Sequence, residues 1–171
     1  MNFEGRARVF GDDVNTDYII SSRRKRETID ESRLKEYLFE GVDPTFAASV
    51  LPDDVIVAGS GFGCGSAMEV AVTVLQAAGI RAVLARTFAR SFYRNAINNG
   101  LLVVECDTSS IVEGDRLSVQ LDEPAVKVVI PARGIMLKGA PMPPLMRRIL
   151  ESGGLVEFLR REGSFEVPAS P

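Results

Sequence analysis

The sequence predicts an α/β fold with a partly parallel sheet flanked by helices. Three short apolar runs alternate with two helical segments that each end at a glycine, in the order 55–58, 70–79, 82–85, 88–99 and 101–104. This alternation is typical of βαβ units, whose right-handed crossovers place the strands parallel. Residues 55–104 are therefore expected to form a βαβαβ core.

The flanking segments complete one domain over residues 1–171, a length that suits a single sizeable core. Residues 3–10 alternate in polarity as a first strand does. Further elements are expected as a helix at 33–40, a C-terminal β-hairpin at 116–121 and 125–131, two helices at 145–150 and 155–161, and a frayed tail at 164–171.

The composition excludes several classes of function. With 46% hydrophobic and 25% charged residues and a net charge of −3, the chain favours neither disorder nor bulk binding to nucleic acid or anionic membranes. No apolar run approaches the roughly 20 residues that span a bilayer, and the first residues lack a signal-peptide pattern. Two cysteines indicate a reducing compartment. We therefore expect a cytoplasmic protein.

The chain contains no histidine. This excludes a Ser-His-Asp triad, a histidine base and histidine metal ligands. Cys64 and Cys106 cannot by themselves complete the four-thiolate shell of an iron–sulfur cluster. No metal ligands are therefore expected here, and any metal chemistry must come from another chain.

A glycine-rich turn over 59–69 links the first strand and helix of the predicted core. Glycines at 59, 61, 63 and 65 indicate backbone at positive φ or in close approach to another group. Ser66 follows, where we expect the helix to begin. Unpaired N–H groups and the positive end of the helix dipole would favour an anion there.

Three other polar features precede or follow this turn. Asn15-Thr16-Asp17 is either ordinary turn chemistry or part of a site. Four cations at 23–26, in a segment 21–30 expected to be a mobile basic loop, form either a solvated run or a clamp for a carboxylate or phosphate. Arg90 and Arg94 share one helix face, which is either plain surface or a wall of the site.

Together these motifs resemble a known family. The ordered runs 15–17, 61–66 and 88–101, with the ending 150–159, are similar to the small subunits of isopropylmalate isomerase and homoaconitase, and to the swivelling C-terminal domain of aconitases. The resemblance covers nearly the whole chain. It implies an aconitase-type swivelling β/β/α domain.

The resemblance also implies an activity. A large subunit would carry a 4Fe-4S cluster, and the small subunit would close over it to complete a hydro-lyase site. The enzyme would isomerise a 2-hydroxy dicarboxylate or tricarboxylate by dehydration and rehydration. The first expectation is 3-isopropylmalate, in leucine biosynthesis; homoaconitate and a methylated malate remain alternatives.

Site residues follow from the resemblance position by position. Ser66 would be the base and Asp17 an acid that orients charge, while the glycines would leave room for substrate. Substrate contacts are implied at Arg26 (with Arg24 as the alternative) and at Asn15, Thr16, Gly65, Ala67, Met68 and Arg94. The family's usual Ser-Ser-Arg-Glu is replaced by 66–69, Ser-Ala-Met-Glu, which loses two polar contacts.

That departure keeps a second class of function open. A non-catalytic module that binds an anionic metabolite through 23–26 and Ser66 would also fit the sequence. RNA binding, as in some aconitases, is a weaker alternative because the chain is acidic, with a pI near 5.1.

Overall fold

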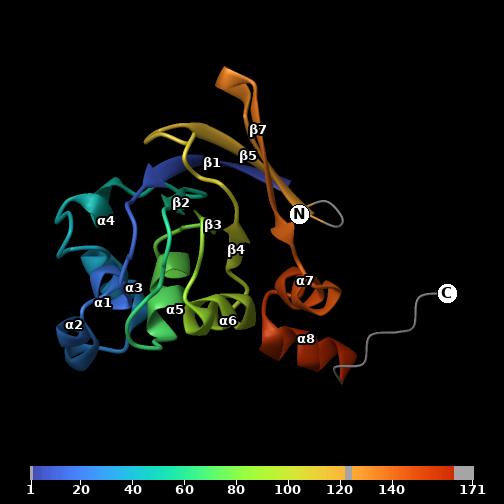
Figure 1. The fold of residues 1–171 in the computed structure, drawn as a ribbon. Helices are drawn as coiled ribbons and strands as arrows, with labels where there is room; N and C mark the ends of the chain where they lie inside the picture. The colour runs from blue at the N-terminus through green and yellow to red at the C-terminus, as the bar shows by residue number, and fades with distance from the viewer. Residues whose placement is uncertain (1, 122–124, 164–171) are drawn as a thin grey trace.

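A computed structural model describes residues 2–121 and 125–163, so the tail expected at 164–171 lies outside the described residues (Figure 1). The fold is α/β, as the sequence predicts, with one seven-stranded sheet in the order β4-β3-β2-β1-β5-β6-β7. The strands are β1 (Asn2–Val9), β2 (Val55–Ala58), β3 (Ala82–Ala85), β4 (Leu102–Glu105), β5 (Arg116–Leu121), β6 (Ala125–Ile130) and β7 (Ile135–Pro141).

The sheet has a parallel half and an antiparallel half that meet at β1. Strands β1 to β4 run parallel, with Ala7 opposite Val55 and Val55 opposite Ala82. Strand β1 pairs antiparallel with β5, and β5, β6 and β7 continue as a meander. Every residue of β2 and β3 is buried, as strands covered on both faces require.

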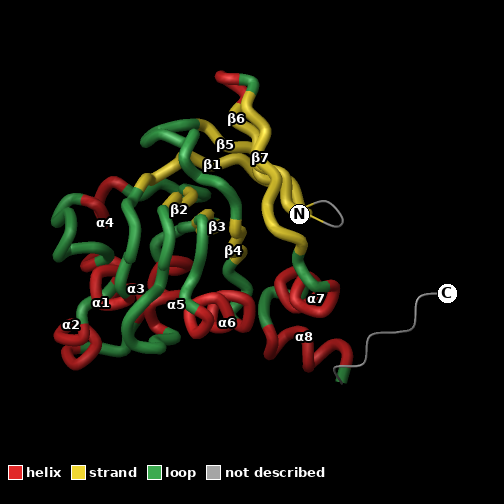
Figure 2. Tube along the Cα trace, viewed as in Figure 1, coloured by secondary structure: helices red, strands yellow, loops and turns green. Residues whose placement is uncertain are grey.

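Helices gather at the ends and on one side of the sheet (Figures 1 and 2). They are α1 (Thr16–Ile19), α2 (Ser22–Glu27), α3 (Glu31–Leu34), α4 (Phe46–Ser49), α5 (Val70–Ala77), α6 (Arg90–Asn98), α7 (Pro144–Glu151) and α8 (Leu155–Glu162), with 3₁₀ turns η1 (Lys35–Tyr37) and η2 (Pro131–Arg133). None of the helices in the described part of the chain has the length and apolar character needed to cross a membrane.

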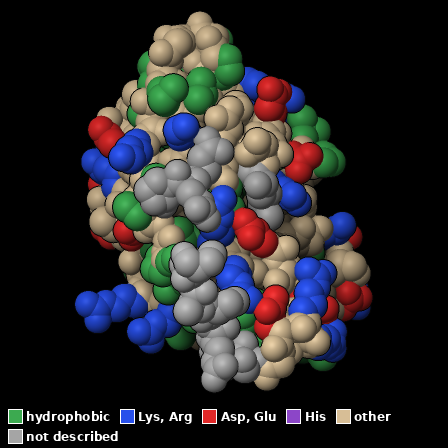
Figure 3. Space-filling model, turned by 90° about the vertical axis from the view of Figure 1, so that its right-hand side faces the viewer, with side chains coloured by type: hydrophobic (Ala, Val, Ile, Leu, Met, Phe, Trp, Pro, Cys, Tyr) green, Lys and Arg blue, Asp and Glu red, His purple; other side chains and the backbone are tan. Residues whose placement is uncertain are grey.

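Cationic and anionic side chains are interspersed on the face seen in Figure 3. Charges of the two last helices also pair with each other, as Arg148 does with Glu162 at 2.6 Å. This mixed face is unlike the basic stripe of a nucleic-acid-binding surface.

Two expected elements differ in the structure, and one strand was not expected. The basic segment 21–30 is not all loop, because 22–27 form α2: the Ser21 hydroxyl caps the helix, and Glu27 pairs with Arg23 and Arg24. The helix expected at 33–40 is divided into α3 and η1. Strand β7 was not predicted because Gly139 and Pro141 resemble turn residues, yet it pairs with β6.

Candidate functional site

The glycine turn, residues 59–69, lies between the segments that follow β1 and β3, at the carboxyl ends of the parallel strands. Open α/β sheets bind ligands at these carboxyl ends. Four backbone hydrogen bonds join the turn to the segment after β1: Gly59 N to Gly11 O, Asp13 N to Ser60 O, Gly63 N to Val14 O and Thr16 N to Cys64 O, at 2.7–3.0 Å. On the other side, Phe62 N donates to Thr87 O at 3.1 Å.

The four glycines of the turn make room for the protein's own side chains. A Cβ atom at each would lie within 2.5 Å of a neighbouring side-chain atom: Asp12 for Gly59, Asp13 for Gly61, Phe92 for Gly63 and Asn15 for Gly65. Gly61, Gly63 and Gly65 also have positive φ. The glycines are thus needed for close packing inside this chain, and the expectation that they leave space for substrate is not needed to explain them.

Replacing Gly63 by alanine should lower the free energy of unfolding by about 3 kcal/mol. The new Cβ would lie 2.3 Å from Phe92 Cβ, at a backbone φ of +78°. Gly114→Ala is the matched control, because Gly114 has φ +84° and open space around its Cβ position. The control should lose only about 1 kcal/mol. Urea denaturation measures both, and equal losses would contradict the packing argument.

Ser66 is exposed and does not begin a helix, contrary to the prediction. Helix α5 begins at Val70. The Ser66 carbonyl accepts instead from the Thr16 hydroxyl of α1 at 2.9 Å. Thr16 thereby connects two of the predicted site motifs.

The turn still has unused backbone donors although no helix begins at Ser66. In the part of the chain that the structure describes, the N–H groups of Ser66, Ala67 and Met68 donate no hydrogen bond. Successive free backbone N–H groups form concavities that bind anions. The turn therefore offers backbone donors beside the Ser66 hydroxyl.

Asn15 and Asp17 lie at the start of α1. The Asn15 side chain caps the helix by accepting from Asp17 N at 2.9 Å. This is the ordinary turn chemistry that the sequence allowed as one of two alternatives. Asp17 is exposed, and its carboxylate accepts from the Ser22 hydroxyl of α2 at 2.7 Å. It lines a hollow of about 690 Å³ together with Arg23.

The two candidate arginines of α2 differ in their surroundings. Arg24 donates to Glu40 at 2.8 Å and to Glu27 at 2.9 Å, and it stacks 3.7 Å from the Tyr37 ring centroid. The hydrogen bonds to Glu40 and Glu27 raise the pKa of Arg24 above its usual range. Arg26 is exposed and pairs with no carboxylate among the described residues.

Two other predicted contacts have contrasting positions. Met68 is half-buried, and its sulfur contacts the Lys25 amine, so α2 and the glycine turn touch. Arg94 is exposed on α6, about 200° around the helix from Phe92, the residue that packs on Gly63. The structure thus brings Met68 to the site and shows no contact of Arg94 with the glycine turn.

Sequence reasoning missed three residues that fix the turn. The Asp12 carboxylate accepts from Ser60 N at 2.7 Å and from Arg86 Nη2 at 2.6 Å. The hydrogen bond from the Ser60 N–H, followed in importance by the one from Arg86, lowers the pKa of Asp12. Thr87 Oγ1 accepts from Gly61 N at 2.9 Å. The sequence feature that could have identified them is their position shortly after β1 and β3, at the carboxyl ends of the parallel strands, where open α/β sheets bind ligands.

The described residues contain no group of three or more His, Cys, Asp or Glu side chains close enough to hold a metal ion. Cys64 is half-buried in the turn, and Cys106 is buried, which raises the pKa of its thiol to about 11. This donor set does not suit an iron–sulfur cluster within the chain.

Comparisons with known proteins identify the relatives of this chain. The Aconitase C-terminal domain matches residues 49–109. The 3-isopropylmalate dehydratase small subunit 1 of Methanopyrus kandleri is 48% identical over 93% of each chain. The methanogen homoaconitase small subunit of Methanocaldococcus jannaschii is 44% identical over 94% of this chain and 93% of its own. The crystal structure of 3-isopropylmalate dehydratase from M. jannaschii superposes with a TM-score of 0.89 at 43% identity, covering 95% and 96% of the two chains.

Proposed function

The chain belongs to the family of 3-isopropylmalate dehydratase small subunits, and we propose that its glycine turn and α2 complete the active site of a two-subunit hydro-lyase. The large subunit supplies the rest of the site, including the 4Fe-4S cluster. The substrate is a 2-hydroxy dicarboxylate or tricarboxylate, with 3-isopropylmalate as the first candidate.

One observation carries this proposal: Thr16 holds the glycine turn against α1. Its N–H donates to Cys64 O and its hydroxyl to Ser66 O, both at 2.9 Å. Since α2 also touches the turn through Lys25 and Met68, we infer that the hydroxyl, the backbone donors and the basic helix lie on one surface. An acidic substrate can contact all three at once.

In the proposed reaction, Ser66 removes the proton from the carbon next to a substrate carboxylate. The electron pair of that C–H bond forms the C=C bond, and the hydroxyl on the neighbouring carbon leaves. The partner's cluster supplies the Lewis acid for that hydroxyl. Ser66 must act as an alkoxide, and the nearby N–H groups favour negative charge there. Return of the proton and water with the opposite placement completes the isomerisation.

Substrate choice depends on how carboxylates are held. Ala67 and Met68 stand where the family usually has a serine and an arginine, and Met68 presents an apolar thioether beside Lys25. Arg26 and the free backbone N–H groups must then hold the carboxylate. A relative named for homoaconitase keeps a tricarboxylate as an alternative, and one named for citramalate, at 43% identity, keeps a methylated malate as another.

Co-expression with a candidate large subunit tests the function. The purified complex should form the unsaturated acid from 3-isopropylmalate, seen by its ultraviolet absorbance, faster than from homoisocitrate or a methylated malate. Preference for another diacid would change the substrate but keep the reaction class. A complex with an intact cluster that dehydrates none of them would refute the proposal.

Arg26→Gln should raise KM about tenfold or more with little change in kcat. The exposed guanidinium has no carboxylate partner among the described residues, so its loss removes a substrate contact and leaves α2 intact. Arg23→Gln on the same helix, whose partner Glu27 is 3.8 Å away, should leave KM unchanged. A normal KM for Arg26→Gln, with a raised KM for a folded Arg24→Gln, would assign the contact to Arg24.

A second candidate function rests on the donors being present in this chain alone. The N–H groups of 66–68 and Arg26 would let the isolated chain sense an anionic metabolite. Calorimetry separates the two: tight diacid binding by the isolated chain favours a sensor, and binding only by the complex favours the enzyme.

A further inference from the structure

A second cavity lies at the amino ends of the parallel strands, opposite the carboxyl ends where the glycine turn lies. It has a volume of about 460 Å³, in the range of small-molecule sites. Its walls come from residues that precede β2, β3 and β4, and from α5 and α7, including Asp53, Gln76, Arg81, Leu101 and Glu151. These are the amino ends of the parallel strands, so the cavity shares none of the predicted site residues.

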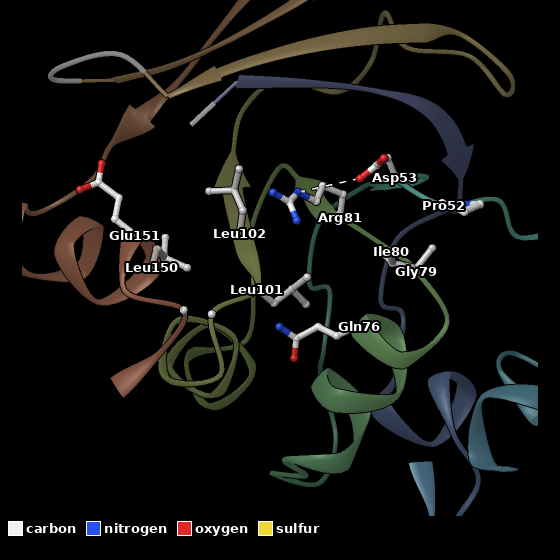
Figure 4. A pocket seen from close by; sticks show the side chains of 12 residues that line it. Pro52, Asp53, Gln76, Gly79, Ile80, Arg81, Leu101, Leu102, Leu150 and Glu151 are labelled. Atoms are coloured by element: carbon white, nitrogen blue, oxygen red, sulfur yellow. Dashed lines mark ion pairs between the residues drawn. The ribbon is translucent and has the colours of Figure 1, made fainter. Parts of the chain in front are cut away.

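Arg81 is the cation of this cavity, and its hydrogen-bonding capacity is unused. Its only ion pair among the described residues, Nε to Asp53 Oδ1, is 4.0 Å long, and its guanidinium donates no hydrogen bond to them. Figure 4 shows Arg81 reaching from the start of β3 toward Leu102. A planar guanidinium with free donors is suited to bind a carboxylate through two parallel hydrogen bonds.

Apolar side chains form the floor beside this cation. Leu101, Leu102 and Leu150 line the cavity and are each at most 3% exposed. Because these leucines expose little surface to water, an aliphatic chain that packs against them gains mainly dispersion contacts. The Gln76 amide uses Nε2 to donate to Asn99 O at 2.8 Å, so its oxygen remains an acceptor at the wall.

Two carboxylates at the rim limit the charge of an occupant. Asp53 is exposed beside Arg81, and Glu151 accepts from Arg147 at 3.0 Å. The cavity has one guanidinium, whose Nε lies 4.0 Å from Asp53 and whose Cζ lies 5.6 Å from the Phe3 ring centroid. It therefore suits one carboxylate and disfavours a diacid, because a second negative charge would face Asp53 or Glu151.

We propose that this cavity binds a small aliphatic monocarboxylate, with its carboxylate on Arg81 and its chain on Leu101, Leu102 and Leu150. The site is separate from the proposed diacid site and does not depend on that function. Helix α5 runs from the glycine turn at Val70 to the cavity at Gln76, so one rigid element touches both.

Titration of the full chain with 4-methylpentanoate tests the site, followed by NMR of leucine methyl groups and glutamine side-chain amides. Signals of Leu101, Leu102, Leu150 and Gln76 should shift saturably. The neutral isostere 4-methylpentanamide should bind about tenfold more weakly or less, because it loses the charge-assisted bonds. Shifts confined to the glycine turn, or equal binding of the amide, would overturn the proposal.

Arg81→Gln should weaken 4-methylpentanoate binding about tenfold or more. Arg116→Gln is the matched control, since Arg116 is also an exposed arginine with one loose carboxylate partner, Glu4 at 3.4 Å, and it lies outside the cavity. It should bind like the parent chain. Unchanged binding by Arg81→Gln would refute the site, because both substitutions are at the surface and leave the core intact.

Discussion

Replacing Ser66 by alanine should lower kcat of the assembled enzyme by about 10²–10⁴-fold, the usual contribution of a positioned base. Ser66 is exposed, and its backbone is held through its carbonyl by Thr16, so the loss of the hydroxyl leaves the turn in place. The complex should still assemble and bind substrate. Single-turnover formation of the unsaturated acid measures the chemical step directly.

Ser60→Ala provides the control within the same turn. Ser60 is held through its backbone, with its N–H on the Asp12 carboxylate at 2.7 Å and its carbonyl accepting from Asp13 N. Its hydroxyl makes no hydrogen bond to the described residues, so kcat should be unchanged. Full activity of Ser66→Ala, or an equal loss in Ser60→Ala, would contradict the role of Ser66 as base.

Local pattern predicted the parallel half of the fold because each of its signals lies within one segment. Short, fully apolar runs such as 55–58 and 82–85 favour interior strands. Gly79 and Gly100 end the two helices that connect the parallel strands β2, β3 and β4. Strand β7 lacks such a signal, because its pairing with β6 is a tertiary interaction that overrides Gly139 and Pro141.

The sequence located segments that meet at the candidate site, but it did not show the contacts between them. The motifs placed Ser66, Asp17 and Met68 on segments that touch, but no local pattern shows that the Thr16 hydroxyl donates to the Ser66 carbonyl or that α5 begins only at Val70. Likewise, only the fold reveals that Arg24 pairs with Glu40, while Arg26 pairs with no carboxylate in the described part of the chain. Partners distant in sequence decide these roles.

Asp54 carries a buried charge that lies outside the candidate site and that the fold requires. Its side chain is 1% exposed and joins β1 to the start of β2. It accepts from Arg6 at 2.7 and 3.1 Å, from Leu51 N at 3.0 Å, and from Arg8 at 3.4 Å. Burial raises the pKa of Asp54, but the bonds from Arg6 and Leu51 outweigh it, and the net pKa is lowered.

Asp54→Asn should therefore lower the free energy of unfolding by about 3–5 kcal/mol at pH 7, since it leaves the mostly buried Arg8 without part of its counter-charge. Asp53→Asn is the control. That side chain is 57% exposed, and its Oδ1 is as far as 4.0 Å from Arg81 Nε, so the change should cost about 0.5 kcal/mol or less. Urea denaturation measures both.

The loss should also depend on pH, because the folded pKa of Asp54 lies below the unfolded value of about 3.9. The stabilisation is complete above the unfolded pKa and disappears as pH falls through the folded pKa. The difference between parent and Asp54→Asn should thus be constant from about pH 7 to 5 and shrink below about pH 4. A difference that stays the same at pH 3 would mean that packing, and not the carboxylate charge, stabilises the junction of β1 and β2.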